Sequence, residues 1–349
     1  VAGEGSFYDS GSGSISRINA DGQIDIFENV GSVVHAVEAY QNMLLVSING
    51  EYKVQIYNIF EENIELVAEV SMDGQSPREI VVADHKAYVT TWDPDWTVYP
   101  NIDGYVKVIN LDNFQVEESI QVGVMPEGLL YNNGYIWVAN SGESTVSKIN
   151  VTNNIIEDEI YVGHGPLFLS ALNDVIYVAR TYYDDNWSAN FGTSKIGLGG
   201  SSQIMEYGAG IACGGSIMKY NNSIYRSFEG GVAPINQDLE IISEEKIGNY
   251  YASLLYHADV INDNVWMTLT DFSNINEVKE LSIVGEEINS YQVGAIPGDF
   301  AQWDMCYFSG DVNQDESLNV FDAVLIMNGA LYSLPYNCES DLNSDGAIN

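Results

Sequence analysis

Short runs rich in Val, Ile and Tyr recur along the chain, and turns rich in Asn, Asp and Gly separate them. In the first four units a run such as LLVSI or IWVAN has its central valine 15 residues after a glycine: Val46, Val89, Val138 and Val178. Short β-branched runs bounded by turn residues predict β-strands. No stretch before residue 320 has a convincing helical period, so the pattern predicts an all-β fold up to that point.

The pattern repeats with a period of forty-odd residues. A glycine opens each unit, with 40 to 49 residues between successive members: Gly31, Gly74, Gly123, Gly163, Gly208, Gly248 and Gly294. In four units a proline follows three residues later: Pro77, Pro126, Pro166 and Pro297. Each unit contains four runs, which predicts four antiparallel strands and is typical of a β-propeller blade.

Six units are complete, and the seventh is divided between the two ends of the sequence. Residues 14–31 match the third and fourth strands of a unit, residues 6–10 are a candidate second strand, and residues 294–304 match the first. Pairing these segments completes a seventh blade and leaves no free edge between the first and last blades. The sequence therefore predicts a seven-bladed β-propeller over residues 1–304, whose N- and C-terminal strands share the closing blade.

Two stretches carry a resemblance to a known family. The segments IWVANSGESTVSKIN (residues 136–150) and IYVAR (residues 176–180) resemble the YVTN-type seven-bladed propellers. The resemblance covers residues 6–304 and implies the fold. It implies no activity, because propellers host many unrelated functions.

After residue 304 the propeller pattern ends, and acidic and amide residues alternate. A twelve-residue calcium loop takes oxygen ligands from positions 1, 3, 5 and 12 and from the backbone carbonyl at position 7. In order, the residues at positions 1, 3, 5, 7 and 12 are Asp311, Asn313, Asp315, Ser317 and Asp322. The pattern restarts with Asp341, Asn343 and Asp345. These residues predict Ca²⁺ binding, with the last carboxylate of the first loop in a predicted helix; the alternative is a solvated Asp/Asn-rich loop.

Residues 310–349 resemble a type I dockerin, the paired calcium-loop module that docks to a cohesin. The resemblance implies that residues 305–349 form a small helical, EF-hand-like module that needs Ca²⁺ to fold and has a cohesin-type partner. Glu316 departs from the family pattern, because the sharp turn at position 6 favours Gly. Val320 and Phe321 stand in place of a Ser–Thr pair, and the second repeat is incomplete.

The three cysteines are Cys213, Cys306 and Cys338. The last two bracket the first calcium loop, so we expect a disulfide between them, with Cys213 as a buried small hydrophobe. Closing a loop of this size contributes about 3–4 kcal/mol in the chain-entropy model. A disulfide beside a calcium site predicts an extracellular or cell-surface location.

The charge balance narrows the partners. The chain has 50 acidic and 12 basic residues, a net charge of −38. Such a surface repels nucleic acid and anionic membranes and attracts divalent cations. No run of 18 apolar residues occurs, so no membrane span is expected. The 23 Tyr and 6 Trp residues indicate a folded chain rather than a disordered acidic one.

The sequence offers no catalytic set. Positions at the start of the innermost strands hold polar residues of different types, which we expect to line a wet channel and satisfy one another: His35, Arg78, Glu79, Glu127 and Asp299. A channel metal would need carboxylates or imidazoles repeated around one ring. Only four histidines occur, and no nucleophile elbow, zinc motif or phosphate loop is present. We therefore expect no enzyme activity; the alternative is a propeller hydrolase or lyase that uses Glu79, Glu127 or His35.

Two loops between second and third strands mix aromatic and acidic residues, so both are expected on one face of the disc. Aromatic rings on loops usually contact something. The candidate partner contacts are Trp92, Asp93, Asp95 and Trp96 in one loop, and Tyr182, Tyr183, Asp184 and Trp187 in the other. We expect them to contact a neighbouring subunit or a glycan; the alternative is that they fold back over their own blades.

These features predict a non-catalytic extracellular structural protein. Its propeller subunits would be linked through the calcium-stabilised tail into a homo-oligomer or a fibre, because a contact that does not close on itself gives a filament. A second prediction is an adaptor whose propeller binds a glycan or protein and whose tail docks to a cohesin-type scaffold. The third is the propeller hydrolase or lyase.

Overall fold

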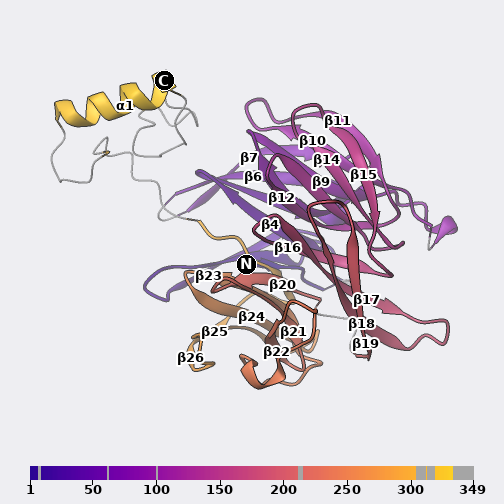
Figure 1. Cartoon of the computed structure of the whole chain (residues 1–349). Coiled ribbons are helices and arrows are strands. Elements are labelled where there is room, and N and C mark those ends of the chain that lie inside the picture. Colours follow the sequence, from indigo (N-terminus) through magenta and orange to yellow (C-terminus); the bar gives the residue numbers. More distant parts are fainter. Residues whose placement is uncertain are drawn as a thin grey trace.

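The computed structural model describes residues 1–6, 9–60, 63–99, 101–210, 215–303, 312 and 319–332. Seven antiparallel sheets follow one another along the chain and form the blades of a propeller, which confirms the predicted fold (Figure 1). In the first three blades the strands run outward from the channel in sequence order. Blade 1 contains β4 (Val34–Tyr40), β5 (Met43–Ile48), β6 (Lys53–Ile59) and β7 (Ile64–Ser71). Blade 2 contains β8 (Ser76–Ala83), β9 (Lys86–Trp92), β10 (Gly104–Asn110) and β11 (Gln115–Val122). Blade 3 contains β12 (Pro126–Asn132), β13 (Tyr135–Asn140), β14 (Thr145–Asn150) and β15 (Ile155–Tyr161).

The remaining four blades continue the same order. Blade 4 contains β16 (Pro166–Leu172), β17 (Val175–Tyr183), β18 (Ala189–Ile196) and β19 (Ser202–Ala209). Blade 5 contains β20 (Ile217–Tyr220), β21 (Ser223–Phe228) and β22 (Gly231–Ile235). Blade 6 contains β23 (Leu255–Ile261), β24 (Asn264–Thr270), β25 (Asn276–Leu281) and β26 (Glu287–Gln292). Blade 7 contains β27 (Pro297–Asp299), β1 (Ala2–Gly3), β2 (Gly13–Ile18) and β3 (Ile24–Gly31).

The innermost strands form a closed ring. Each lies next to the innermost strand of the following blade, in the order β4, β8, β12, β16, β20, β23 and β27, and β27 lies next to β4. The first strand of every blade therefore faces the central channel. Side chains near the start of these strands meet there although they are far apart in sequence.

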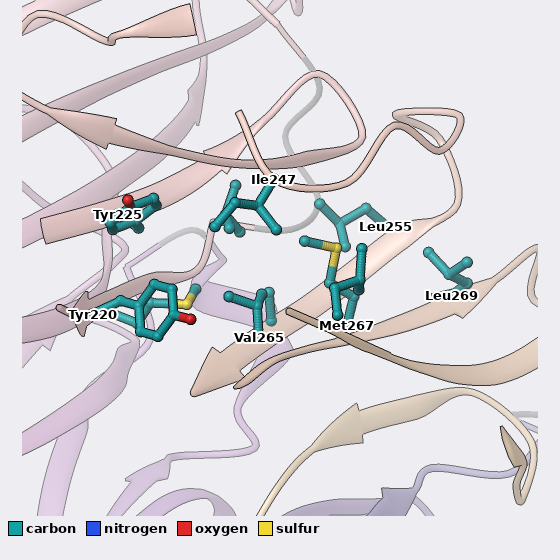
Figure 2. Packing of buried hydrophobic residues seen from close by; sticks show 11 residues of the cluster. Tyr220, Tyr225, Ile247, Leu255, Val265, Met267 and Leu269 are labelled. Carbon is teal, nitrogen blue, oxygen red and sulfur yellow. The ribbon is translucent and has the colours of Figure 1, made fainter. Parts of the chain in front are cut away.

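The hydrophobic core lies between blades rather than in one centre. Figure 2 shows one such layer, where Tyr220 and Tyr225 of blade 5 pack with Val265, Met267 and Leu255 of blade 6. Blade 5 also packs against blade 4 on its other face, so a blade is covered by a neighbour on both faces, which is why the strands read as short apolar runs.

Turn chemistry explains the hairpins between first and second strands. Both central residues adopt the left-handed conformation in several of them, with φ of 44° and 58° at Asn221 and Asn222 and 50° and 60° at Asn262 and Asp263. Asn and Asp tolerate this conformation best among residues other than Gly, and the resulting turn matches the strand twist.

The closing blade differs from the prediction in its second strand. Its innermost strand, β27, comes from the C-terminal side and pairs with β1, which in turn pairs with β2. The second strand is therefore Ala2–Gly3 rather than residues 6–10, of which residues 9–10 lie in a turn. The sequence hid this strand because it is two residues long and contains no β-branched residue.

Blade 5 has three strands in the described part, whereas four were expected. The segment after β22 reaches the sheet only through two bridges, Ile235 with Ile241 and Val232 with Ile247. Between them, η3 (Ser243–Glu245) curls into a 3₁₀ turn. Four consecutive polar residues, Ser243 to Lys246, break the period-2 alternation that a continuous edge strand needs.

The remaining elements are short. The 3₁₀ turns η1 (Asn49–Glu51) and η2 (Trp96–Val98) lie in loops between second and third strands. The helix α1 (Val320–Tyr332) agrees with the predicted helix in the tail and lies apart from the blades in Figure 1. Among the described helices, none has the length and apolar character that a membrane span requires.

Candidate functional site

Polar side chains from several blades converge in the central channel. Near the starts of innermost strands lie His35 on β4, Arg78 and Glu79 on β8, and Glu127 on β12. Asp299 is the last residue of the three-residue innermost strand β27. Their side chains keep between 9% and 19% of their surface exposed although they lie at the axis of the molecule. This residual exposure is what a narrow, wet channel produces.

An arginine–glutamate pair joins blades 2 and 3 across the channel. Arg78 Nε and Nη2 donate to the two carboxylate oxygens of Glu127 at 2.9 and 2.7 Å. The Trp92 ring covers the guanidinium, with 4.4 Å from Arg78 Cζ to the ring centroid. Trp92 Nε1 donates to the Pro126 carbonyl at 2.8 Å, so the indole is fixed on the same two blades. This arrangement satisfies the one arginine that reaches the channel.

A neutral histidine lies beside this pair. His35 Nε2 is 3.8 Å from Glu79 Oε1 and 4.0 Å from Glu127 Oε2. Burial, followed by the positive charge of Arg78, holds the pKa of His35 well below its usual value. The buried Nδ1 atom has no hydrogen-bond partner. The imidazole is therefore uncharged at neutral pH, with one ring nitrogen unsatisfied.

A second histidine–carboxyl pair lies between blades 6 and 7. His257 Nε2 is 3.8 Å from Asp299 Oδ1, and Asp299 Oδ2 accepts the backbone N–H of Val37 at 2.8 Å. Burial lowers the pKa of His257 to about 4. Asp299 thus ties the closing blade to blade 1 while it contacts the imidazole of blade 6.

Sequence reasoning missed several channel residues. Tyr256 on β23 donates through its hydroxyl to Glu4 Oε1 at 2.7 Å, and Glu4 follows β1. His257 was also missed, because blade 6 has Leu255 where other blades have the marker proline. Leu255 pairs with Leu269 as Pro77 pairs with Thr91 in blade 2, so Leu255 is the equivalent of Pro77. An alignment of the second strands would therefore have identified His257, two residues after Leu255.

The channel carboxyls hold their protons unusually tightly. Burial raises the pKa of Glu38 to about 8 and that of Asp299 to about 7. It also raises the pKa of Asp259 to about 6 and that of Glu79 well above its usual value, in the latter case with repulsion from Asp299 and Glu127. Near neutral pH Glu38 and Glu79 carry protons that exposed carboxyls lose, and Asp299 carries one part of the time, so the channel is less negative than its composition suggests.

The channel can move protons but shows no metal cage. Among the described residues, no group of three or more His, Cys, Asp or Glu side chains is placed to hold a metal ion. A neutral imidazole beside two carboxyls can accept or donate a proton, and perturbed pKa values of this kind are common at functional sites. They also occur in purely structural networks.

In the blade 2 loop, some of the predicted contact residues face the channel or hold the loop itself. The Trp92 ring lies over Arg78 at the channel. Asp93 Oδ1 accepts the N–H of Asp95, and Asp95 Oδ1 accepts the N–H of Thr97, at 3.0 and 3.1 Å. These acids therefore hold their own loop, and the side chain of Trp96 is outside the described part of the structure.

The blade 4 hairpin presents its aromatic residues outward. Tyr183 and Trp187 are 58% and 77% exposed, with ring centroids 6.4 Å apart. Tyr182 instead donates to the carboxylate of Glu206, and Asp184 Oδ1 accepts the N–H groups of Asn186 and Ser188. Of the predicted contact residues whose side chains are described, Tyr183 and Trp187 offer the largest exposed rings.

Asp322 is the one predicted calcium ligand whose side chain lies among the described residues. Asp322 is fully buried, and its Oδ2 accepts the N–H of Asn319 at 2.8 Å. Asn319 Oδ1 accepts the N–H of Phe321 at 2.9 Å, so the two side chains form a reciprocal cap at the start of α1. The remaining predicted ligands and all three cysteines lie outside the described residues: Asp311, Asn313, Asp315, Ser317, Asp341, Asn343, Asp345, Cys213, Cys306 and Cys338.

Comparisons with known proteins identify the fold alone. No protein-family model matches the chain, and no relative was found among curated sequences. Among solved structures, a candidate 6-phosphogluconolactonase from Bacteroides uniformis aligns with a TM-score of 0.60 and 13% identity over 84% of this chain and 96% of that one. Hydrazine synthase from Kuenenia stuttgartiensis aligns with a TM-score of 0.58 and 12% identity, covering 77% and 89% of the two chains. The computationally designed protein Ika8 aligns with a TM-score of 0.54 and 9% identity, covering 78% and 91%.

Proposed function

We propose that the chain is a non-catalytic extracellular assembly protein whose propellers are joined through a calcium-stabilised C-terminal segment. The observation that carries this proposal is the exposed apolar surface of α1. Its large hydrophobic side chains are 40% to 70% exposed: Val320, Phe321, Val324, Leu325, Met327 and Leu331. A helix with this much exposed apolar surface is expected to be covered by something else.

The position of this helix in the sequence supports a role for calcium in the proposed contact. The helix begins at the end of the Asp311–Asp322 loop, in the segment that resembles a dockerin. The buried Asp322 carboxylate, position 12 of that loop, caps the helix. Calcium bound by the loop would therefore fix the same carboxylate that starts the apolar helix. We infer that calcium stabilises the surface through which a second copy of the chain is held, and an open-ended contact of this kind gives a fibre.

The test removes the apolar surface and leaves the propeller untouched. The double substitution Phe321→Ser and Val324→Ser is expected to shift the full-length chain from assembled particles to single chains in sedimentation velocity with calcium present. A matched control replaces Ile283 and Val284, which are 46% and 75% exposed on a blade turn, by serine. Loss of assembly in both variants, or in neither, would refute a tail-mediated contact. Assembly that needs an added cohesin would support the adaptor instead.

Hydrolysis or lyase chemistry in the channel is a second candidate, and His35 is the observation that favours it. A neutral imidazole between Glu79 and Glu127 can act as a general base. The one channel arginine is already paired with Glu127, and the other charges are carboxyls, so a phosphorylated substrate is disfavoured. An activity that disappears in both His35→Asn and Glu79→Gln, with folding retained, would establish this function; activity unaffected by either change would exclude it.

A further inference from the structure

A second cavity lies away from the channel, between blades 4 and 5. Its volume is about 690 Å³, which is in the range of small-molecule sites. Strand β19 supplies one wall, and β21 and the segment after β22 supply the other. Six of its lining residues define the chemistry of the site: Phe191, Tyr207, Arg226, Phe228, Glu229 and Glu240.

The feature that sets this cavity apart is a buried arginine without a carboxylate. Arg226 is 1% exposed and lines the cavity. Its Nη1 donates to the Gly192 carbonyl and to Thr193 Oγ1, and its Nε donates to the Ser227 carbonyl. All three acceptors are neutral. Within the part of the chain that the structure describes, Arg226 forms no ion pair with a carboxylate.

This is unusual for the protein, because the chain carries a net charge of −38 and only four arginines. The neighbouring Arg180 is fully buried too, but its Nη2 lies 2.8 Å from Glu206 Oε1. Glu206 also accepts the Tyr182 hydroxyl, so it is already engaged. Burial lowers the pKa of Arg226 to about 10. Tyr207 opposes this shift, and the charge of Arg180 adds to it. An added anion would offset this cost.

The side chains around the guanidinium indicate which other groups a ligand of this cavity would carry. The rings of Phe191 and Tyr207 lie 5.0 and 5.3 Å from Arg226 Cζ, and Phe228 adds a third ring to the cavity wall. Glu229 and Glu240 lie at the rim, where their oxygens can accept hydroxyl donors. A carboxylate, several hydroxyls and a flat apolar face occur together in an acidic sugar, whose ring can stack on aromatic side chains.

We propose that this cavity binds a carboxylated sugar, such as a uronic acid or the acidic end of a glycan. The ligand carboxylate meets Arg226, its ring lies against the aromatic wall and its hydroxyls donate to the rim glutamates. This site is independent of the assembly proposed above, because it contains no residue of the tail.

The charge of the chain gives the proposal a distinctive salt dependence. A surface with a net charge of −38 repels an anionic ligand at long range, and added salt screens that repulsion. The contact with Arg226 is buried and is screened much less. Affinity for the acidic sugar is therefore expected to rise with moderate salt, the opposite of binding to an exposed basic patch.

The test uses the full-length chain and three probes of similar size: glucuronate, glucose and benzoate. Isothermal titration calorimetry is expected to give an affinity for glucuronate at least about tenfold higher than for glucose, because only glucuronate pairs with the arginine. Benzoate, which has the charge and a flat face but no hydroxyls, is expected to bind more weakly than glucuronate. No binding of glucuronate, equal binding of glucose, or stronger binding of benzoate would each overturn the proposal.

Variants locate the binding in this cavity. Arg226→Lys keeps a positive charge but removes the planar guanidinium, whose Nη2 takes no part in the three bonds above, and is expected to weaken glucuronate about tenfold. Because a change at a buried arginine can prevent folding, Phe228→Ala provides a second variant at a partly exposed wall residue, and it must also weaken binding. Lys148→Met, which removes a cation outside this cavity, is the matched control and must leave the affinity unchanged. Unchanged affinity in Phe228→Ala, or loss in Lys148→Met, would contradict the assignment.

Discussion

At the scale of single residues, Arg78 and Glu127 form an ion pair at the axis of the propeller. Its two hydrogen bonds join neighbouring blades, and both side chains are largely removed from water. Glu127→Gln is expected to destabilise the protein by about 3 kcal/mol, because it leaves a buried guanidinium without its counter-ion. Urea unfolding followed by tryptophan fluorescence measures this change, since Trp92 lies on Arg78.

The matching control removes both charges. Arg78→Met combined with Glu127→Leu leaves no unpaired charge, so the double variant is expected to lose less stability than Glu127→Gln alone. A double variant that is less stable than the single one would show instead that the ion pair itself stabilises the fold.

The channel carboxyls and histidines also make stability depend on pH. The raised pKa values, about 8 for Glu38 and about 7 for Asp299, contribute stability that is lost as pH rises through those values. The pKa of His257, lowered from 6.5 to about 4, contributes stability that is lost as pH falls below 6.5. Between about pH 6.5 and 8 the raised carboxyl pKa values lower the free energy of unfolding as pH rises. The buried Val1 ammonium, whose pKa is lowered from 8.0 to about 6 chiefly by burial, raises it over the same window.

Two substitutions separate the channel from the general acidity of the surface. Glu38→Gln is expected to make the slope of stability against pH more positive between about pH 6.5 and 8, because it removes a carboxyl that loses stability there. Glu65→Gln, on an exposed outer strand, is expected to leave the slope unchanged. The measurement is the urea midpoint at several pH values in high salt. An equal effect of the two substitutions would assign the slope to surface repulsion.

The position of a residue within the sequence repeat predicted some of the residues that line the channel. The proline marker of blades 2 and 3 led to Arg78, Glu79 and Glu127, because strand pairing places equivalent positions at the axis. It could not lead to Tyr256 or Glu4. Blade 6 lacks the proline, and the two-residue strand before Glu4 carries no β pattern.

At the scale of elements, the closing blade depends on close backbone approach at Gly3. A Cβ atom at this position would lie 2.6 Å from Ser14 Oγ and 3.2 Å from the Ala295 carbonyl oxygen. Gly3→Ala is therefore expected to cost about 1–3 kcal/mol, because strands from the two ends of the chain must separate to admit the methyl group. Thermal unfolding measures the loss.

Gly199 is the matched control for this substitution. It lies in an exposed turn, its φ is not in the left-handed region, and a Cβ there would meet nothing within 4 Å. Gly199→Ala is expected to be neutral within about 0.5 kcal/mol. Equal losses at both positions would show that closure of the ring is not the weak point of the fold.

Element prediction worked where the local pattern carried the signal. The strands with Val, Ile and Tyr alternation and the Asn/Asp turns were found from sequence, because those residues favour extended and left-handed backbone. The prediction of a fourth strand in blade 5 was wrong within the described residues, because the 3₁₀ turn η3 occupies the middle of that segment. In this segment Ile241 and Ile247 each form a single bridge to β22 instead of a continuous ladder of strand hydrogen bonds, so apolar residues still recur as they would in a strand.

At the scale of the whole molecule, the propeller offers a closed, rigid disc and the tail offers an apolar helix. The disc has paired edges inside the ring, so strand addition is not needed to complete it. The exposed residues of α1, by contrast, lack cover from the blades. The sequence predicted the tail helix from the calcium-loop spacing. It could not predict the cavity at Arg226, because the walls of this cavity come from two blades. For the same reason it could not predict that Arg226 has no carboxylate partner among the described residues.

The most direct test of the proposed assembly is the mass of the particles by light scattering with calcium and after chelation. We expect masses many times the 38.4 kDa of one chain in calcium, falling to that of single chains when a chelator is added and returning when calcium is restored. Particles of one chain under both conditions, or large particles that persist after chelation, would contradict a calcium-stabilised joint.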